Sequence, residues 1–261
     1  MPSIHSYVDL VKLILSESAK YFALLLLVVL AVRFWRRLPR LSGAARRGNL
    51  ILACLVTLLS IGVGYFSICH SMSLMYWHFG VKAFQNSQVD PAFSLFDTSW
   101  HYHNNADALG GKGVCLLVAG RADAGLSLLE SAKEMRHRRG TPFENFYEGL
   151  YYFYNNDVTN AVPPLEAASA DTDYAWEVTK LFAVIQLDRN QPQEAAKLMQ
   201  PYLEAQISDP DHAYIMARLD LANGKRAEAQ ALVDKFSTAD MAPFWRTRFE
   251  RLKAGLQNGK T

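Results

Sequence analysis

The feature that most constrains this chain is a stretch without charge, from Gly48 to Val81, which contains no Asp, Glu, Lys or Arg. Its apolar heart runs from Asn49 to Cys69. Because a helix of about 20 apolar residues crosses the hydrocarbon core of a bilayer, the stretch predicts a transmembrane helix over about 49–72. Aromatic residues follow toward its far end, where such side chains settle at the membrane interface.

A second apolar run lies earlier, over residues 21–32, between Lys20 and Arg33. The stems of Lys and Arg lie in lipid while their charges reach the head groups, so we expect a first span over about 20–35. A cleaved signal peptide is the alternative, which the arginines that follow the run disfavour. Apolar residues at helical spacing within 1–20 predict an amphipathic segment that lies along the membrane surface or leans on the soluble domain. The alternative is that this stretch extends the first membrane helix. Residues 21–75 are thus predicted to form a two-helix membrane anchor.

The charge is divided unevenly along the chain. The net charge of +2 comes from 27 Lys and Arg against 25 Asp and Glu, yet residues 1–80 carry eight basic and two acidic groups. Six arginines lie between Arg33 and Arg47. Short basic loops stay in the cytoplasm, so we expect the loop 36–47 to be cytoplasmic and both termini to be extracytoplasmic. The expected location is integral to a membrane, such as a bacterial inner membrane, with anionic lipid near the loop.

The rest of the chain carries a pattern with a period close to 34 residues, which indicates a repeat architecture. A small residue recurs at Gly80, Gly113, Gly149, Ala183 and Ala217. A second small residue follows twelve positions later, at Ala92, Gly125, Ala161, Ala195 and Ala229. A turn-forming residue precedes each of these by five positions, at Ser87, Gly120, Asn156, Asn190 and Gly224. A bulky apolar residue follows by four positions, at Phe96, Leu129, Leu165, Met199 and Val233.

This pattern is typical of helix–turn–helix packing, because small residues on facing helices let two backbones approach and the bulky residue fills the space beside them. No alternating strand pattern of useful length occurs, so the predicted fold class is all-α. The net acidity of residues 81–261 argues against a nucleic-acid partner and favours proteins.

The motif resembles the tetratricopeptide repeat (TPR) family across roughly residues 76–236, most closely at 120–126 and 223–232. The resemblance implies a helix–turn–helix solenoid over 76–261, whose first helix continues the second span. The segment Pro243–Leu256 predicts a last helix at about 242–256 with an apolar face that caps the open end of the stack.

Motifs for catalysis or metal binding are missing from the sequence. His101 and His103 are too few ligands for a zinc site, and Gly110–Gly113 lacks the spacing of a phosphate-binding loop. The three cysteines form neither a metal motif nor a disulfide framework. We therefore expect no enzymatic activity, no catalytic residue, no metal and no cofactor.

The TPR resemblance implies a concave groove, lined by the first helices of the repeats, which binds a peptide or helix of a protein partner. The expected lining residues are Phe146, Leu150, Phe153, Tyr154, Lys180, Val184, Asp188, Tyr214, Arg218 and Leu221. The alternative is that the aromatic cluster of 143–154 packs against a neighbouring repeat or the N-terminal helix. The predicted function is a membrane-anchored protein–protein interaction scaffold or assembly factor. The alternative function is an accessory subunit of a larger membrane complex, associating through spans whose small residues permit close helix packing: Ser60, Gly62 and Gly64.

Overall fold

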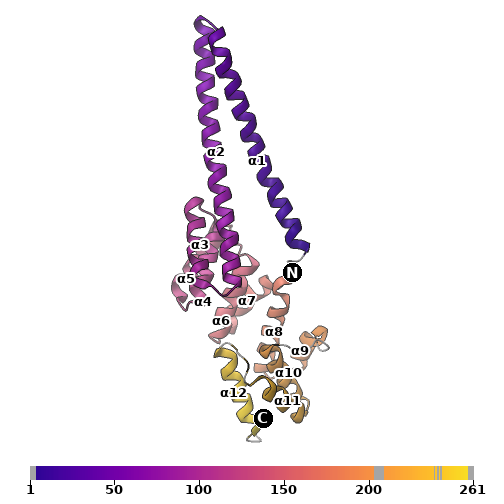
Figure 1. Ribbon diagram of the computed structural model, residues 1–261. Coiled ribbons are helices and arrows are strands. Elements are labelled where there is room, and N and C mark those ends of the chain that lie inside the picture. Colours follow the sequence, from indigo (N-terminus) through magenta and orange to yellow (C-terminus); the bar gives the residue numbers. More distant parts are fainter. Residues whose placement is uncertain (1–3, 203–208, 238, 240, 242, 258–261) are drawn as a thin grey trace. The chain divides into compact units, whose positions relative to one another are not determined.

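The computed structural model describes residues 4–202, 209–237, 239, 241 and 243–257, with the side chains of all of these except 4–20 and 243. Every regular element in this part of the chain is a helix, and no strand occurs in it (Figure 1). The all-α prediction is confirmed to that extent, while the side chains of the expected amphipathic segment 1–20 lie outside the described residues. The chain divides into two compact units, residues 1–119 and 120–261, and each is described by itself.

The first unit is a long helical hairpin followed by two shorter helices (Figure 1). Its elements are α1 (Ile4–Arg37), the 3-10 turn η1 (Leu38–Arg40), α2 (Gly43–Gln85), α3 (Val89–Tyr102) and α4 (Ala106–Val118). Helix α2 has 43 residues, which at 1.5 Å per residue is about 64 Å. It shows no break near residue 75, so the helical backbone passes directly from the apolar stretch into the first repeat, as the sequence predicts.

Small side chains hold the two hairpin helices together. Ala53, Ser60 and Ser67, spaced seven positions apart on α2, are buried. A Cβ added to Gly64 would lie 3.5 Å from the side chain of Leu24 on α1, which is ordinary van der Waals contact. Small residues at such a seam let helix backbones approach closely.

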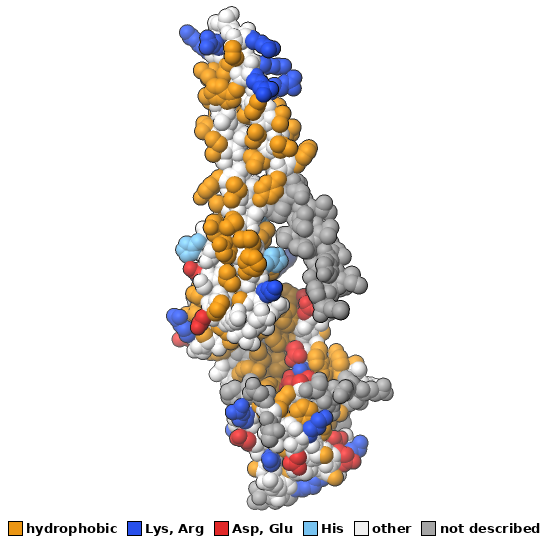
Figure 2. Space-filling view, viewed as in Figure 1, with side chains coloured by type: hydrophobic (Ala, Val, Ile, Leu, Met, Phe, Trp, Pro, Cys, Tyr) orange, Lys and Arg blue, Asp and Glu red, His pale blue; other side chains and the backbone are white. Residues whose placement is uncertain are grey.

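The two hairpin helices are also joined by side-chain hydrogen bonds. The Tyr21 hydroxyl donates to Ser71 Oγ at 3.0 Å, and Trp35 Nε1 donates to Thr57 Oγ1 at 3.0 Å. Outside the seam, large apolar side chains of both helices remain exposed (Figure 2). Among the described residues, α2 alone is long and apolar enough to cross a membrane, judged by length and composition. By this criterion the described residues contain one candidate span, so the other predicted span, in α1, is not shown.

A bulky residue from α3 fills the space beside glycines of two other helices. The Phe96 ring is fully buried. A Cβ on Gly80 of α2 or on Gly111 of α4 would lie 2.7 Å from Phe96 Cε1, which is closer than real Cβ contacts allow. Gly113, which the register selects on α4, is also buried; Gly111 is the glycine that touches the ring.

The second unit is built from helical pairs and a final helix. Its elements are α5 (Ala122–Met135), α6 (Pro142–Tyr154), α7 (Val158–Ser169), α8 (Thr172–Asp188), α9 (Pro192–Met199), the 3-10 turn η2 (Gln200–Tyr202), α10 (Pro210–Ala222), α11 (Arg226–Phe236) and α12 (Pro243–Gln257). Helix α6 packs on α7, α8 on α9, and α10 on α11. Helix α12 packs on α10 and α11 and buries Trp245, Phe249, Leu252 and Leu256.

The predicted repeat register is confirmed by the backbone at the turns. Positive φ angles between 57° and 76° occur at the five turn positions, which are Ser87, Gly120, Asn156, Asn190 and Gly224. Glycine and asparagine adopt this left-handed conformation at little cost, so they end the first helix of a pair and start the turn. The bulky residue that follows each turn in the register is buried, with at most 1% of its surface exposed.

We expect Gly149→Ala to destabilise the protein by roughly 1–3 kcal/mol through overpacking. The new Cβ would lie 2.6 Å from Leu165 Cγ and 3.2 Å from the carbonyl oxygen of Ala161. Denaturant titration of the full chain, followed by circular dichroism, measures the effect. Adding Leu165→Ala removes the clash, so the double variant should lose less stability than the sum of the single variants.

The matched control is Gly224→Ala. Its φ is +76° and nothing lies within 4 Å of its added Cβ. It should therefore destabilise through backbone strain and combine additively with Leu165→Ala. Additive behaviour at Gly149 as well would contradict the close-packing account.

Candidate functional site

Most of the side chains expected to line a groove are buried within the second unit. The exposed fraction is 0% for Val184, 2% for Lys180, 3% for Phe153, 4% for Tyr214 and 9% for Phe146. Leu150, Tyr154 and Arg218 are half-buried. A fully buried side chain such as Val184 packs in the core and offers no surface to a partner.

The aromatic side chains of α6 pack against other helices of the unit. The rings of Phe146 and Tyr174 on α8 have centroids 5.0 Å apart. The ring of Phe244 on α12 lies 5.1 Å from Phe153 and 4.6 Å from Tyr154. Burial raises the pKa of Tyr154 to about 12. These aromatic side chains of α6 therefore belong largely to the core between α6, α8 and α12. This agrees with the alternative that the aromatic cluster packs against a neighbouring repeat.

The ammonium group of Lys180 lies within a cluster of three carboxylates. Its ammonium lies 2.6 Å from Asp211 Oδ2, 2.9 Å from Glu177 Oε2 and 3.6 Å from Asp209 Oδ1. Burial on its own would lower the pKa of Lys180, but the hydrogen bond and the charge of Asp211 outweigh it and the pKa is raised. The charged lysine thus ties α8 to the start of α10.

His212 lies next to this cluster. Its ring is 5.1 Å from the Trp176 ring in an edge-to-face arrangement, and its Nε2 is buried with no hydrogen-bond partner among the described residues. Burial and the nearby charge of Lys180 lower the pKa of His212. The imidazole is therefore neutral in the folded protein at neutral pH, and its role is packing.

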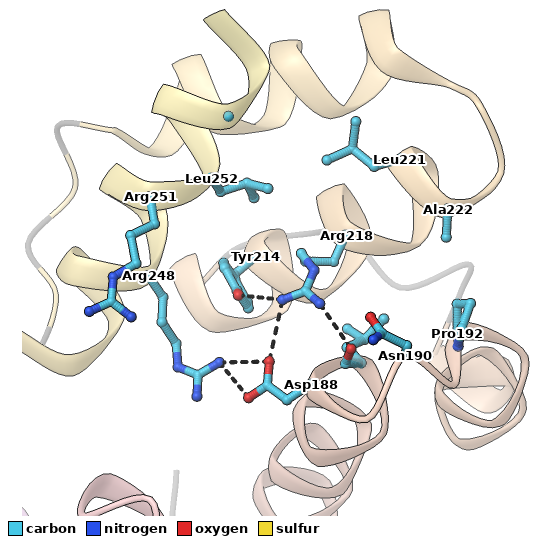
Figure 3. Close-up of a pocket in the computed structure, with 12 residues that line it drawn as sticks. Asp188, Asn190, Pro192, Tyr214, Arg218, Leu221, Ala222, Arg248, Arg251 and Leu252 are labelled. Atoms are coloured by element: carbon cyan, nitrogen blue, oxygen red, sulfur yellow. Dashed lines mark hydrogen bonds and ion pairs between the residues drawn. The ribbon is translucent and has the colours of Figure 1, made fainter. Parts of the chain in front are cut away.

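A pocket of about 850 Å³ lies between the end of α8, the start of α9, α10 and α12 (Figure 3). It contains four of the predicted groove residues, which are Asp188, Tyr214, Arg218 and Leu221. Its other lining residues are Leu187, Asn190, Pro192, Ala222, Arg248, Arg251, Leu252 and Gly255. This is where the expected groove has an accessible surface.

One carboxylate orders two arginines of this pocket (Figure 3). Arg248 Nη1 lies 2.8 Å from Asp188 Oδ2, and Arg218 Nη1 lies 3.4 Å from Asp188 Oδ1. Arg218 also donates to the Tyr214 hydroxyl at 2.8 Å and to the carbonyl oxygen of Leu187 at 2.9 Å. The two guanidinium groups are thereby held in place before any ligand arrives.

The third arginine of the pocket is unpaired. Arg251 is exposed on α12, three positions after Arg248, and makes no hydrogen bond or ion pair with any residue that the structure describes. Three arginines and one aspartate give the lining a net charge of two positive units. A guanidinium of this kind pairs with a carboxylate through two parallel hydrogen bonds.

Sequence reasoning did not place Arg248 and Arg251 in the site, because α12 lies beyond the repeat register. A signal was present in the segment Phe244–Lys253, where four basic residues alternate with the apolar face of the helix. Only the fold shows that two of them lie beside the end of α8.

The other candidate residues, histidines and cysteines, do not form a metal site in the described part of the chain. Within the described residues, no three side chains of His, Cys, Asp or Glu come together so as to hold a metal ion. His103 instead packs edge-on against His70, with ring centroids 5.1 Å apart. Burial raises the pKa of Cys115 to about 12, so this thiol stays protonated.

Comparison with known proteins supports the fold alone. The chain is similar to the solved structure of pilF from Pseudomonas aeruginosa, with a TM-score of 0.52 and 17% sequence identity over 73% of this chain and 91% of that one. A thermophilic TPR protein of Thermus thermophilus, TTC0263, gives a TM-score of 0.47 and 16% identity over 69% of this chain and 98% of that one. No protein-family model and no curated protein matches the sequence. The fold is a TPR-like helical repeat.

We expect Lys180→Met to cost roughly 1.5–3 kcal/mol of stability, because it removes the cation that Asp211, Glu177 and Asp209 share, while the partial exposure of these carboxylates limits the loss. The control is Lys197→Met. Lys197 pairs with Glu194 at 2.7 Å, but the two side chains are 70% and 53% exposed, so its loss should cost less than about 1 kcal/mol. Denaturant titration of both variants measures the difference. Equal stability of the two would show that Lys180 is not a structural ion pair.

Proposed function

We propose that this protein is a membrane-anchored scaffold or assembly factor that binds an acidic segment of a partner protein in the pocket between α8, α10 and α12. The observation that carries the proposal is the unpaired Arg251 beside two arginines that Asp188 already orders. The TPR-like fold is compatible with binding of protein segments along stacked helices.

The size and walls of the pocket suit a short peptide segment. Its volume of about 850 Å³ lies within the range of roughly 300–1,000 Å³ that is usual for ligand sites. Leu221, Leu252 and Pro192 give apolar contact, while the arginines give a positive end. Because Arg218 and Arg248 are held in advance, a ligand immobilises few side chains when it binds.

The membrane anchor is part of the proposal. We place two spans at about 20–35 and 49–72, with the loop 36–47 in the cytoplasm and both termini outside it, for example in a periplasm. Three features support this placement: the length and apolar composition of α2, the exposed apolar side chains of the hairpin, and the arginines at its turn (Figure 2).

The second candidate function is an accessory subunit that joins a larger membrane complex through its spans. The observation that favours it is Gly62, which has nothing within 4 Å of an added Cβ, whereas a Cβ added to Gly64 would lie 3.5 Å from Leu24 of α1. Gly62 therefore leaves a shallow position on α2 where a further helix could approach.

The partner-binding pocket is tested with a photo-crosslinking amino acid at Leu221 in the full-length protein, expressed in membranes of its source organism. We expect a defined adduct that falls at least tenfold with Arg251→Glu, because the charge reversal repels an acidic segment. Lys253→Glu is the matched control, since Lys253 is on the same helix but does not line the pocket. An adduct that responds equally to both variants would contradict the site. Absence of an adduct at Leu221, with an adduct instead when the crosslinking amino acid is placed at Gly62 of α2, would favour the second function.

Topology is tested separately with reporters. Alkaline phosphatase, which is active only outside the cytoplasm, should be active when fused after Thr261. A fluorescent protein that matures only in the cytoplasm should fluoresce when inserted after Ser42. Fluorescence after Thr261 would overturn the proposed orientation, and extraction of the protein from membranes by alkaline carbonate would overturn the anchor itself.

A further inference from the structure

A second pocket lies in the first unit, at the end of the helical hairpin. It has a volume of about 410 Å³ and is lined only by residues of α1 and η1. Val28, Val29 and Val32 form its apolar part. Its basic part consists of Arg33, Arg36, Arg37 and Arg40.

Helical spacing explains why these side chains share a surface. Residues four apart lie one above the other on a helix, so Val28, Val32 and Arg36 form one row, while Val29, Arg33 and Arg37 form the next. The turn η1 brings Arg40 to the same end. Each row thus passes from valine to arginine in the direction of the hairpin turn, where the arginines gather beyond the apolar side chains (Figure 2).

The charge of this pocket is not neutralised by the protein. No Asp or Glu occurs between residues 18 and 89. The four arginines are exposed and make no ion pair or hydrogen bond with any residue in the described part of the chain. Four guanidinium groups around one depression repel one another, so an anion that enters it is stabilised by all of them.

The apolar part of the pocket distinguishes a lipid from a small anion. The valines are 44%, 53% and 44% exposed, in chain order. If the hairpin spans the bilayer as proposed above, these valines lie in the hydrocarbon region and the arginines lie at the head-group level. A phospholipid fits this order, because its phosphate would meet the guanidinium groups while an acyl chain contacts the valines.

We propose that this pocket binds an anionic phospholipid, whose phosphodiester is held by Arg33, Arg36, Arg37 and Arg40 and whose acyl chain lies on Val28, Val29 and Val32. A lipid without an amine is selected, because the ammonium group of a zwitterionic lipid would lie close to four positive charges. Arg binds phosphate with two hydrogen bonds in a fixed geometry. The inference rests on the proposed membrane anchor.

The test titrates detergent-purified full-length protein with phosphatidylglycerol and with phosphatidylcholine, and counts bound lipid by native mass spectrometry. We expect phosphatidylglycerol to bind at least tenfold more tightly than phosphatidylcholine. R36Q/R37Q should weaken phosphatidylglycerol binding at least tenfold, since two charged hydrogen-bond donors are lost. R33Q/R40Q tests the same prediction with the other two arginines.

The matched control is R46Q/R47Q, which removes the same charge at the start of α2, across the hairpin turn, but does not touch the pocket. It should change the affinity less than twofold. Equal weakening by R36Q/R37Q and R46Q/R47Q would overturn the site in favour of diffuse attraction. Glycerol 3-phosphate should fail to displace the lipid at equal concentration; displacement would show a free-anion site instead.

This outcome is distinguishable from failure of the proposed function. If alkaline carbonate extracts the protein from membranes, the anchor fails. If the protein stays in the membrane fraction and yet binds both lipids equally, the anchor stands and the lipid site alone fails.

Discussion

Close approach of helices at residues with little or no side chain is the constraint on which the repeats depend. Gly80 and Gly111 leave room for the Phe96 ring, and Gly149 does the same for Leu165. In each case a methyl group would overlap the bulky side chain, so the helix pair would have to separate. Separation would open a cavity beside a side chain that is now fully buried, and both effects are costly in a close-packed interior. The repeat is therefore visible in the sequence as small and bulky apolar residues that recur at fixed spacing.

Positive charge has different roles in different parts of this protein, and the difference lies in what surrounds it. Lys180 is buried and its charge is matched by Asp211, Glu177 and Asp209, so it stabilises the contact of α8 with α10. Arg251 is exposed and unmatched by any described residue, next to arginines that Asp188 holds. A buried charge without partners would be strongly destabilising. An exposed charge remains solvated by water, so it costs little stability without a partner. Only the second kind is available to a ligand.

The two pockets differ in a way that separates their proposed ligands. In the pocket beside α12, apolar and charged residues come from several helices, and a carboxylate already occupies two of the three arginines. In the pocket on α1, no acidic residue is near in sequence and the apolar part is a row of valines along one helix. The first arrangement suits an acidic peptide with mixed side chains. The second suits an elongated molecule with an anionic head and an apolar tail.

The sequence by itself determined the all-helical class, the repeat period, the positions of the five turns and the passage of one helix from the apolar stretch into the first repeat. These depend on residue size, turn preference and spacing along one segment. It did not determine that Val184 and Lys180 are covered, because a helical register selects a face and not what packs on it. Only the tertiary structure decided where the accessible surface lies. Asp188 and Arg248, sixty positions apart, meet because α12 packs its apolar face on α10 and α11. That contact depends on burial of apolar area between segments far apart in the sequence, and local residue spacing does not predict which segments pack together.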